Sequence, residues 1–100
     1  MKDRRDLLQE WGLPHVQRHG VTLVARGDAD ACLRLVFSEG CDFFGYDAFT
    51  VFEDGGIQPH SDFSPSWAGG QCPPLEEILD TLSGHPSGVT HYEFVFRRGA

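Results

Sequence analysis

The chain of 100 residues is 40% hydrophobic and 23% charged, proportions typical of one folded domain and not of a disordered or fibrous chain. No stretch approaches the roughly 20 apolar residues that cross a bilayer, and no signal-type apolar run stands near the N-terminus. The three scattered cysteines do not resemble a secreted disulfide framework, so we expect a cytoplasmic protein without membrane contact.

The net charge of −7 at pH 7 is concentrated in the middle of the chain. Residues 27–83 carry eleven acidic side chains and a single basic one, Arg34, whereas residues 1–26 carry five basic and three acidic side chains. Phosphate contacts require clustered Lys and Arg, so we expect no direct binding to nucleic acid. An acidic surface suits a protein partner with a basic surface, and the alternative is that the charge only keeps the domain soluble.

The first twenty residues predict two helical segments. Asp3 can cap a helix that runs to Trp11, and Gly12 would end it. Pro14 suits the first position of a short helical turn that Gly20 would close. We therefore expect two helices before the first strand.

Three strands are expected next. "VTLVAR" (21–26) is rich in β-branched residues, and "CLRLVF" (32–37) alternates apolar residues with Arg34. The "GDAD" between them reads as a turn, so the two segments predict a hairpin. A third strand is expected in "FFGYDAFTVFED", most clearly over residues 48–53.

The rest of the chain predicts a long loop, a helix and a last strand. Residues 55–74 are dense in Gly, Pro and Ser, and a connection of that length indicates either a functional loop or an undetected element. Residues 74–83 have the apolar stripe of a helix, and "THYEFVFRR" (90–98) alternates as a strand does. The order α-α-β-β-β-α-β predicts one α+β domain over residues 1–100, with a mainly antiparallel four-stranded sheet and helices on one face.

The segment "CDFFGYDAFTVFEDGG" (41–56) combines five aromatic rings with four carboxylates and has no basic residue. Regular strand alternation places Phe44, Tyr46 and Phe52 on one face and Phe43 and Phe49 on the other. Two helices can cover only one of these faces. The other face is then covered by the long loop or is exposed to another molecule.

An exposed patch of rings and carboxylates has the composition of a recognition surface. The residues expected to bind the partner are Asp42, Phe44, Tyr46, Asp47, Phe52, Glu53, Asp54, Phe63 and Trp67. In this interpretation the carboxylates pair with Arg or Lys of the partner and the rings fill its pockets. In the alternative, Phe63 and Trp67 are lids by which the loop covers the sheet.

The pattern favours a small intracellular binding or inhibitory protein that covers a basic site, such as the nucleic-acid cleft of a nuclease. Immunity proteins and phage-borne inhibitors of host defence act in this way as a class, although no residue motif here matches one. This hypothesis needs no catalytic residue and no cofactor, so a non-enzyme is favoured. Two alternatives are a small metal-dependent or acid–base enzyme centred on residues 55–74 and a homo-oligomeric structural domain or homodimer.

The candidate metal ligands are weak. His15 and His19 in "HVQRH" would share a face of a helix, and His60 and Asp62 in "PHSD" could complete a site. No zinc-type spacing is present, so we expect no metal. Cys72 precedes a predicted helix, but the two prolines and two glutamates that follow it argue against an activated thiolate.

Overall fold

The computed structural model describes residues 4–68 and 71–98. In chain order the elements are α1 (Arg4–Glu10), β1 (Val16–Arg18), β2 (Val21–Ala25), the 3₁₀ turn η1 (Arg26–Asp28), α2 (Ala29–Ser38), β3 (Asp42–Val51), β4 (Ile57–His60), the 3₁₀ turn η2 (Ser61–Phe63), α3 (Leu75–Ser83) and β5 (His91–Arg97). The expected α+β class is confirmed. Within the described ranges no helix has the length and apolar character needed to cross a membrane.

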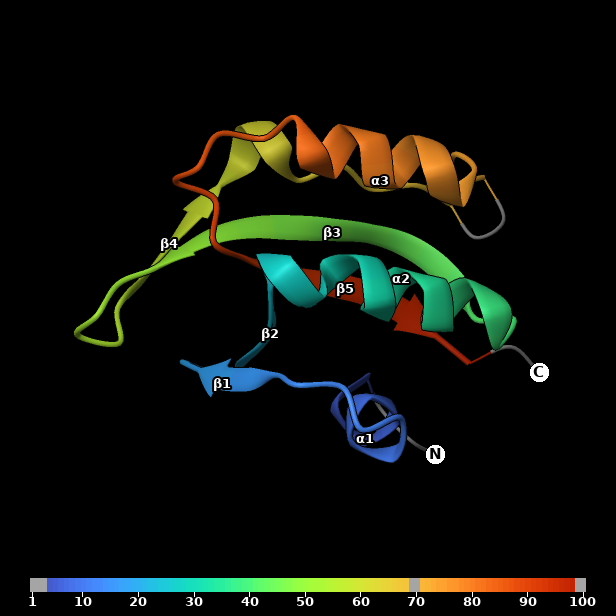
Figure 1. Ribbon diagram of the computed structural model, residues 1–100, viewed down its shortest axis with the longest axis horizontal. Coiled ribbons are helices and arrows are strands. Elements are labelled where there is room, and N and C mark those ends of the chain that lie inside the picture. The colour runs from blue at the N-terminus through green and yellow to red at the C-terminus, as the bar shows by residue number, and fades with distance from the viewer. Residues whose placement is uncertain (1–3, 69–70, 99–100) are drawn as a thin grey trace.

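The strands form one curled antiparallel sheet in the order β1-β2-β5-β3-β4. The helices α2 and α3 lie across one face of it, and α1 lies beside the C-terminal end of β5 (Figure 1). The sheet therefore has five strands where the sequence predicted four, and the predicted order of elements is wrong in three places.

The first error concerns residues 32–37, which belong to the helix α2 and not to a strand. The buried side chains of this helix are Ala29, Cys32, Leu33 and Val36. Their spacing of three, one and three residues is that of a helical stripe, which starts before the segment that looked like a strand. The alternation around Arg34 is a coincidence within this longer helical pattern.

The second error concerns the short helix expected between Pro14 and Gly20. Residues 16–18 form β1 and pair with β2, with Val16 opposite Leu23. His19 and Gly20 both have positive φ, of 51° and 79°. Two such residues in succession make the tight turn that suits the twist of a hairpin, so the turn chemistry outweighs the helix signal of the proline.

The third error concerns the loop of residues 55–74, which contains the strand β4. This strand pairs with the end of β3, from Val51 opposite Ile57 to Ala48 opposite His60. The chain then runs back along β3, where the Tyr46 amide donates to the Pro65 carbonyl at 3.2 Å. Because apolar residues show no regular spacing in this segment, the sequence pattern did not indicate the edge strand β4 or the extended chain that follows it.

A β-bulge in β3 decides which rings face the helices. The pairing with β5 shifts by one residue between Phe43 and Gly45, which leaves Phe44 without a partner. As a result Phe43 and Tyr46 lie on the same face, where Phe43 contacts Phe37 of α2 at 5.9 Å between ring centroids. The expected sharing of one face by Phe44 and Tyr46 is wrong, because one extra residue reverses the alternation.

Gly45 is required at this bulge. Its φ is +145°, and a Cβ atom at this position would lie 2.3 Å from the Pro65 carbonyl oxygen. Only glycine combines this backbone conformation with such a close approach of a neighbouring chain segment.

The main core lies between the sheet and the helices α2 and α3. Tyr92, Phe94 and Phe96 of β5 point into it and are at most 4% exposed. Burial of each large apolar side chain contributes about 1.5–3 kcal/mol to folding. Toward β1, Leu23 and Phe49 are buried on the other face, apart from this core.

The helix α1 protects the edge of β5. Strand β2 pairs only with Tyr92 and the residue before it, so the second half of β5 has no strand on that side. There, Trp11 stacks on Phe96 at 5.8 Å, and Arg4 reaches the Phe94 carbonyl at 3.5 Å. Covering an edge in this way blocks pairing with another chain. The expected cap, Asp3, lies outside the described residues.

Arg26, the first residue after β2, forms hydrogen bonds to the C-terminal end of α3 and to the segment that follows it. Its guanidinium donates to the carbonyls of Pro86 at 2.6 Å and Val89 at 3.1 Å through Nη1, and to those of Leu82 at 3.1 Å and His85 at 2.6 Å through Nη2. Leu82 belongs to α3 and the other three residues to the segment that follows it, so Arg26 holds this segment against the helix, and its charge suits the C-terminal end of the helix dipole.

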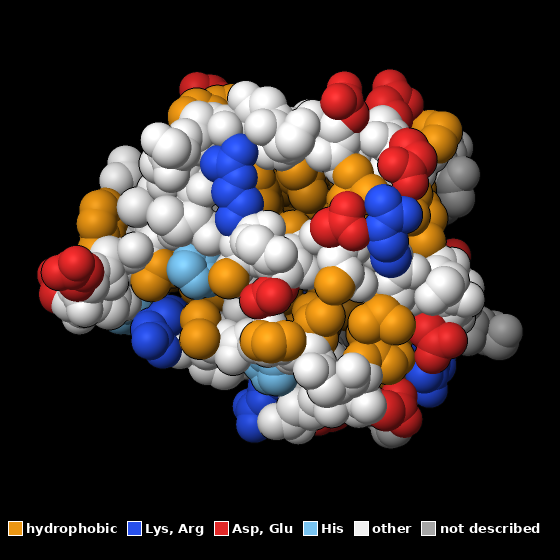
Figure 2. Space-filling view, viewed as in Figure 1, with side chains coloured by type: hydrophobic (Ala, Val, Ile, Leu, Met, Phe, Trp, Pro, Cys, Tyr) orange, Lys and Arg blue, Asp and Glu red, His pale blue; other side chains and the backbone are white. Residues whose placement is uncertain are grey.

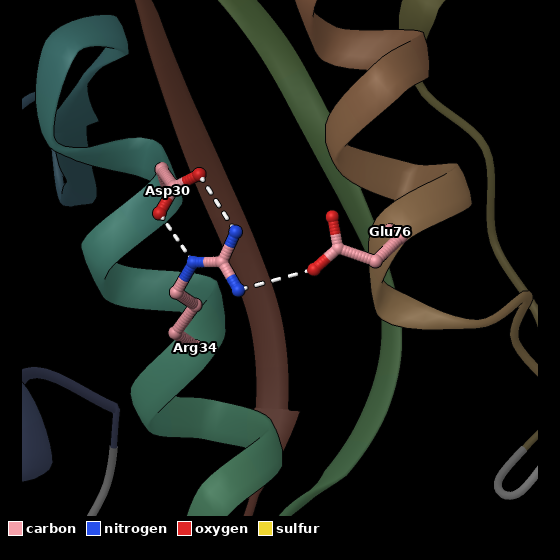
Figure 3. Close-up of polar contacts among 3 residues, drawn as sticks. All are labelled: Asp30, Arg34 and Glu76. Atoms are coloured by element: carbon pink, nitrogen blue, oxygen red, sulfur yellow. Dashed lines mark hydrogen bonds and ion pairs between the residues drawn. The ribbon is translucent and has the colours of Figure 1, made fainter.

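A second arginine joins the exposed sides of the two helices that cover the sheet. Arg34 of α2 donates through Nε to Asp30 at 2.6 Å and through Nη1 to Glu76 of α3 at 3.1 Å (Figure 3). All three side chains are exposed, so these ion pairs contribute little to stability.

Candidate functional site

The nine residues predicted to bind a partner lie in three separate places. Three lie on the side of β3 that faces the helices: Tyr46, Phe63 and Trp67. Three lie in the turn between β3 and β4: Phe52, Glu53 and Asp54. Three lie on the opposite side of β3: Asp42, Phe44 and Asp47. Since β3 has ten residues at about 3.3 Å each, its two ends are about 30 Å apart.

On the helix side, Trp67 and Phe63 pack against other aromatic rings. The Trp67 ring lies 6.1 Å from that of Phe43 and 6.4 Å from that of Tyr46. The Phe63 ring lies 4.7 Å from the imidazole of His85. Trp67 therefore lies over rings of β3, as the lid interpretation expects, whereas Phe63 packs on His85 beyond the end of α3; Tyr46 is only 3% exposed.

The β3–β4 turn extends beyond the helices (Figure 1). Phe52 is 47% exposed, more than any other large hydrophobic side chain in the described part of the chain. Glu53 and Asp54 beside it are also exposed. Asp54 accepts a hydrogen bond from the Gly56 amide at 2.8 Å, so this carboxylate also shapes the turn.

Acidic side chains also gather over α3 (Figure 2). Glu76, Glu77 and Asp80 are all exposed on this helix. Glu76 and Glu77 stand in its first turn, where carboxylates complement the positive end of the helix dipole. This acidic area is thus explained by helix stability, and it carries no aromatic ring suited to recognition.

The outer face, by which we mean the side of β3 and β5 turned away from α2 and α3, carries a more unusual arrangement. Its residues are Asp42, Phe44, Asp47, Glu93, Val95 and Arg97. Asp47 and Glu93 stand directly opposite each other in the pairing of the two strands. Two like charges at such a position destabilise a sheet.

The electrostatics of Glu93 reflect this arrangement. Burial raises the pKa of its carboxyl group, the Arg4 guanidinium 3.6 Å away opposes the rise, and Asp47 adds to it. The side chain is 20% exposed. A further positive charge near Asp47 and Glu93 would stabilise both carboxylates, because opposite charges favour the ionised form.

The next residues along the outer face add an aromatic ring. Arg97 pairs with Asp42 at 3.8 Å, and its guanidinium lies 5.3 Å from the centre of the Phe44 ring. A hollow of about 290 Å³ lies beside the bulge, lined by Phe44, Asp47 and Val95 and by the chain segment of residues 64–67. The bulge thus places an aromatic ring next to the opposed carboxylates.

The candidate metal ligands are not brought together. His19 lies in the β1–β2 turn, and His15 Nδ1 lies 2.9 Å from the Leu13 carbonyl, so the expected shared helix face does not exist. His60 Nε2 lies 2.7 Å from the Thr50 hydroxyl, and Asp62 is exposed on η2. No group of three metal-binding side chains occurs among residues 4–68 and 71–98.

The cysteines of the described part of the chain are free thiols. Cys32 is fully buried in α2, and burial together with Asp28 raises its pKa to about 12. Burial also raises the pKa of Cys41. A thiol with a raised pKa is a poor nucleophile at neutral pH.

No protein-family model, curated protein or solved structure matches this chain. The function is therefore inferred from the geometry of the outer face and of the grooves beside it.

Sequence reasoning missed Glu93, Arg97 and Arg4 as members of this site. Alternation in "HYEFVFR" does place Glu93 on the side opposite Tyr92 and Phe94. Its position across from Asp47 depends on which strands are neighbours and in which register, and neither follows from one strand alone.

Proposed function

We propose that this protein is a small binding domain whose outer face covers a basic site on a protein partner. The observation that supports this proposal is the opposed pair of Asp47 and Glu93. In the free domain their repulsion is relieved only in part by Arg4. A basic side chain of the partner between the two carboxylates would offset their repulsion. Binding would therefore relieve an unfavourable interaction of the free domain.

The aromatic ring and the overall charge support the same proposal. Phe44 beside its hollow gives the partner an apolar contact next to the charged one, as in interface hot spots. The net charge of −7 would draw a basic partner toward the domain before contact.

The proposed mode of action is occlusion, in which the domain covers a basic cleft and no bond is made or broken. A nucleic-acid-binding cleft is one such site, because it presents clustered Lys and Arg. Inhibition in the manner of immunity proteins or anti-defence inhibitors would follow from occlusion; this analogy is one of class alone.

The test begins with the partner captured by the wild-type chain from cells of its own source and identified by mass spectrometry. Its dissociation constant is then measured by calorimetry for wild type, for Asp47→Lys and for the matched control Asp80→Lys. Asp80 is exposed on α3, away from the outer face. We expect Asp47→Lys to weaken binding at least tenfold, about 1.4 kcal/mol, and the control to leave it nearly unchanged.

Binding should also weaken as salt is added, since the attraction is between charges at a surface. Equal affinity for wild type and Asp47→Lys would show that the outer face is not the binding surface. A dimer mass for the isolated chain in light scattering would instead support the homo-oligomeric alternative.

A further inference from the structure

A second groove, of about 410 Å³, lies between the C-terminal end of α3 and the chain segment that follows β4. Thr81 and His85 form the wall on the α3 side, Asp62 and Phe63 form the opposite wall, and Tyr46 also lines it. The groove shares Tyr46 and residues 64–65 with the hollow of the outer face. The two therefore adjoin at this segment.

Tyr46 brings an unused polar group to the groove. Its hydroxyl has no hydrogen-bond partner among the described residues, although the residue is 97% buried, whereas the Tyr92 hydroxyl lies 2.8 Å from His85 Nδ1. In the described part of the chain, Trp11 Nε1 is the one unpaired side-chain polar atom that is sealed from solvent. The Tyr46 oxygen thus keeps contact with solvent, and Tyr46 is one of the residues that line the groove.

The walls of the groove are aromatic and acidic. The Phe63 ring lies 4.7 Å from His85, whose pKa is lowered by burial and by the nearby Arg26, so its imidazole is neutral at pH 7. Asp62 is exposed on one wall. On the other wall, the Thr81 hydroxyl donates to the main-chain carbonyl of Glu77 at 3.0 Å, and its oxygen can still accept a hydrogen bond.

Among residues 4–68 and 71–98, no Lys or Arg side chain lines this groove. A cation with a flat face therefore matches both the charge and the aromatic wall. A guanidinium meets this requirement better than an ammonium, because it is planar, stacks on rings and has five donors in a fixed plane. Its donors need acceptors, and Asp62, the Tyr46 oxygen and the hydroxyls of the walls provide them.

We propose that this groove receives an arginine side chain of the protein partner. The inference rests on the proposed function, because it assigns the residue type that the basic partner presents. A partner surface that straddles residues 64–65 contacts the outer face on one side and inserts its arginine on the other. The groove would then give specificity for arginine, and the charges of the outer face would attract the basic partner.

The test uses N-acetyl-arginine methylamide as a probe, titrated into the isolated chain and followed by NMR. We expect saturable shifts at Tyr46, Phe63 and His85 with a dissociation constant in the millimolar range, as suits so small a ligand. N-acetyl-lysine methylamide has the same charge without the flat group and should bind more weakly. The neutral citrulline analogue should not bind.

Two variants localise the effect. Tyr46→Phe keeps the ring and removes an unpaired hydroxyl, so we expect it to fold normally and to weaken arginine binding at least threefold. Asp62→Asn should weaken binding by a similar factor, and Asp80→Asn should not change it. Equal binding of arginine and citrulline, shifts elsewhere in the chain, or unchanged binding by both groove variants would overturn the proposal.

The probe titration and the partner experiment fail independently. Arginine amide binding tests the groove without any partner, whereas Asp47→Lys tests the outer face without altering the groove. If the captured partner binds Asp62→Asn as tightly as wild type, its contact surface excludes the groove. That result would refute the inserted arginine even if the outer face is confirmed.

Discussion

The two faces of the β3–β5 pair differ sharply in what they do. On the helix side, rings such as Phe43, Phe94 and Phe96 are almost fully buried. On the outer face, Asp47 and Glu93 oppose each other. One strand pair thus stabilises the fold on one side and carries an unfavourable charge pair on the other. Burial of the rings on the helix side offsets the repulsion on the outer face, and functional surfaces commonly reduce stability in this way.

The largest expected effect comes from removing the bulge that separates the two faces. Gly45→Ala places a Cβ atom against the Pro65 carbonyl and should destabilise the fold by about 3 kcal/mol or more. Gly40→Ala is the matched control, because Gly40 has φ +69° and open space around it. We expect about 1 kcal/mol for that change. Urea unfolding measures both, and equal losses would contradict the bulge argument.

The next largest effect concerns the hydrogen bonds of Arg26 on the helix side of the sheet. Arg26→Ala removes four hydrogen bonds, one to the Leu82 carbonyl of α3 and three to carbonyls of the segment that follows it, and should cost about 2–3 kcal/mol. Arg26→Lys should recover little of this, because an ammonium has only three donors and cannot bind all four carbonyls. Chemical unfolding of both variants decides the question. A lysine variant as stable as wild type would reduce the role of Arg26 to its charge.

A smaller effect of opposite sign is expected on the outer face. Asp47→Asn removes the repulsion with Glu93 and should stabilise the domain by about 0.5 kcal/mol, while it weakens partner binding. Asp80→Asn serves as the control and should do neither. Thermal and urea unfolding give the stability. A loss of stability in Asp47→Asn would mean that the aspartate supports the fold.

The smallest effect is a pH dependence. The folded-state pKa of Glu93 is raised, mainly by burial, so protonation of this residue favours the folded state. As the pH falls from 7, wild type should gain stability relative to Glu93→Gln, and the gain should be complete below the ordinary pKa of 4.5. Unfolding of both proteins across this range measures the difference. A relative loss on acidification would reverse the assigned sign.

The last two elements of the fold could be predicted from the sequence. Apolar residues recur with helical spacing along the whole of α3 and alternate with polar or half-buried residues along the whole of β5. Each segment therefore fits one type of secondary structure only. In contrast, α2 was mistaken for a strand because three apolar residues alternate within a longer helical stripe. A segment this short fits both periods, and only the residues that precede it, beginning with Ala29, extend the helical spacing.

The candidate site could be predicted only in part. Asp42 and Phe44 share a face of β3, as strand alternation predicts, whereas Asp47 joins them only because of the bulge. The bulge that turns Tyr46 away from them depends on Pro65, twenty residues later, which approaches Gly45 closely. Such a contact between distant segments has no local signature in the sequence. The opposition of Asp47 and Glu93 is likewise a property of strand order and register.

The bulge at Phe44 also determines which changes of length β3 can accept. Loss of this single residue would leave Phe43 opposite Phe96 and Gly45 opposite Val95, so the strand would alternate regularly and Phe43 would keep its side. Loss of a paired residue elsewhere in the strand would instead exchange the sides of all residues on one side of the deletion. The strand can therefore lose one residue at the bulge without turning its buried rings to solvent, but not one paired residue elsewhere.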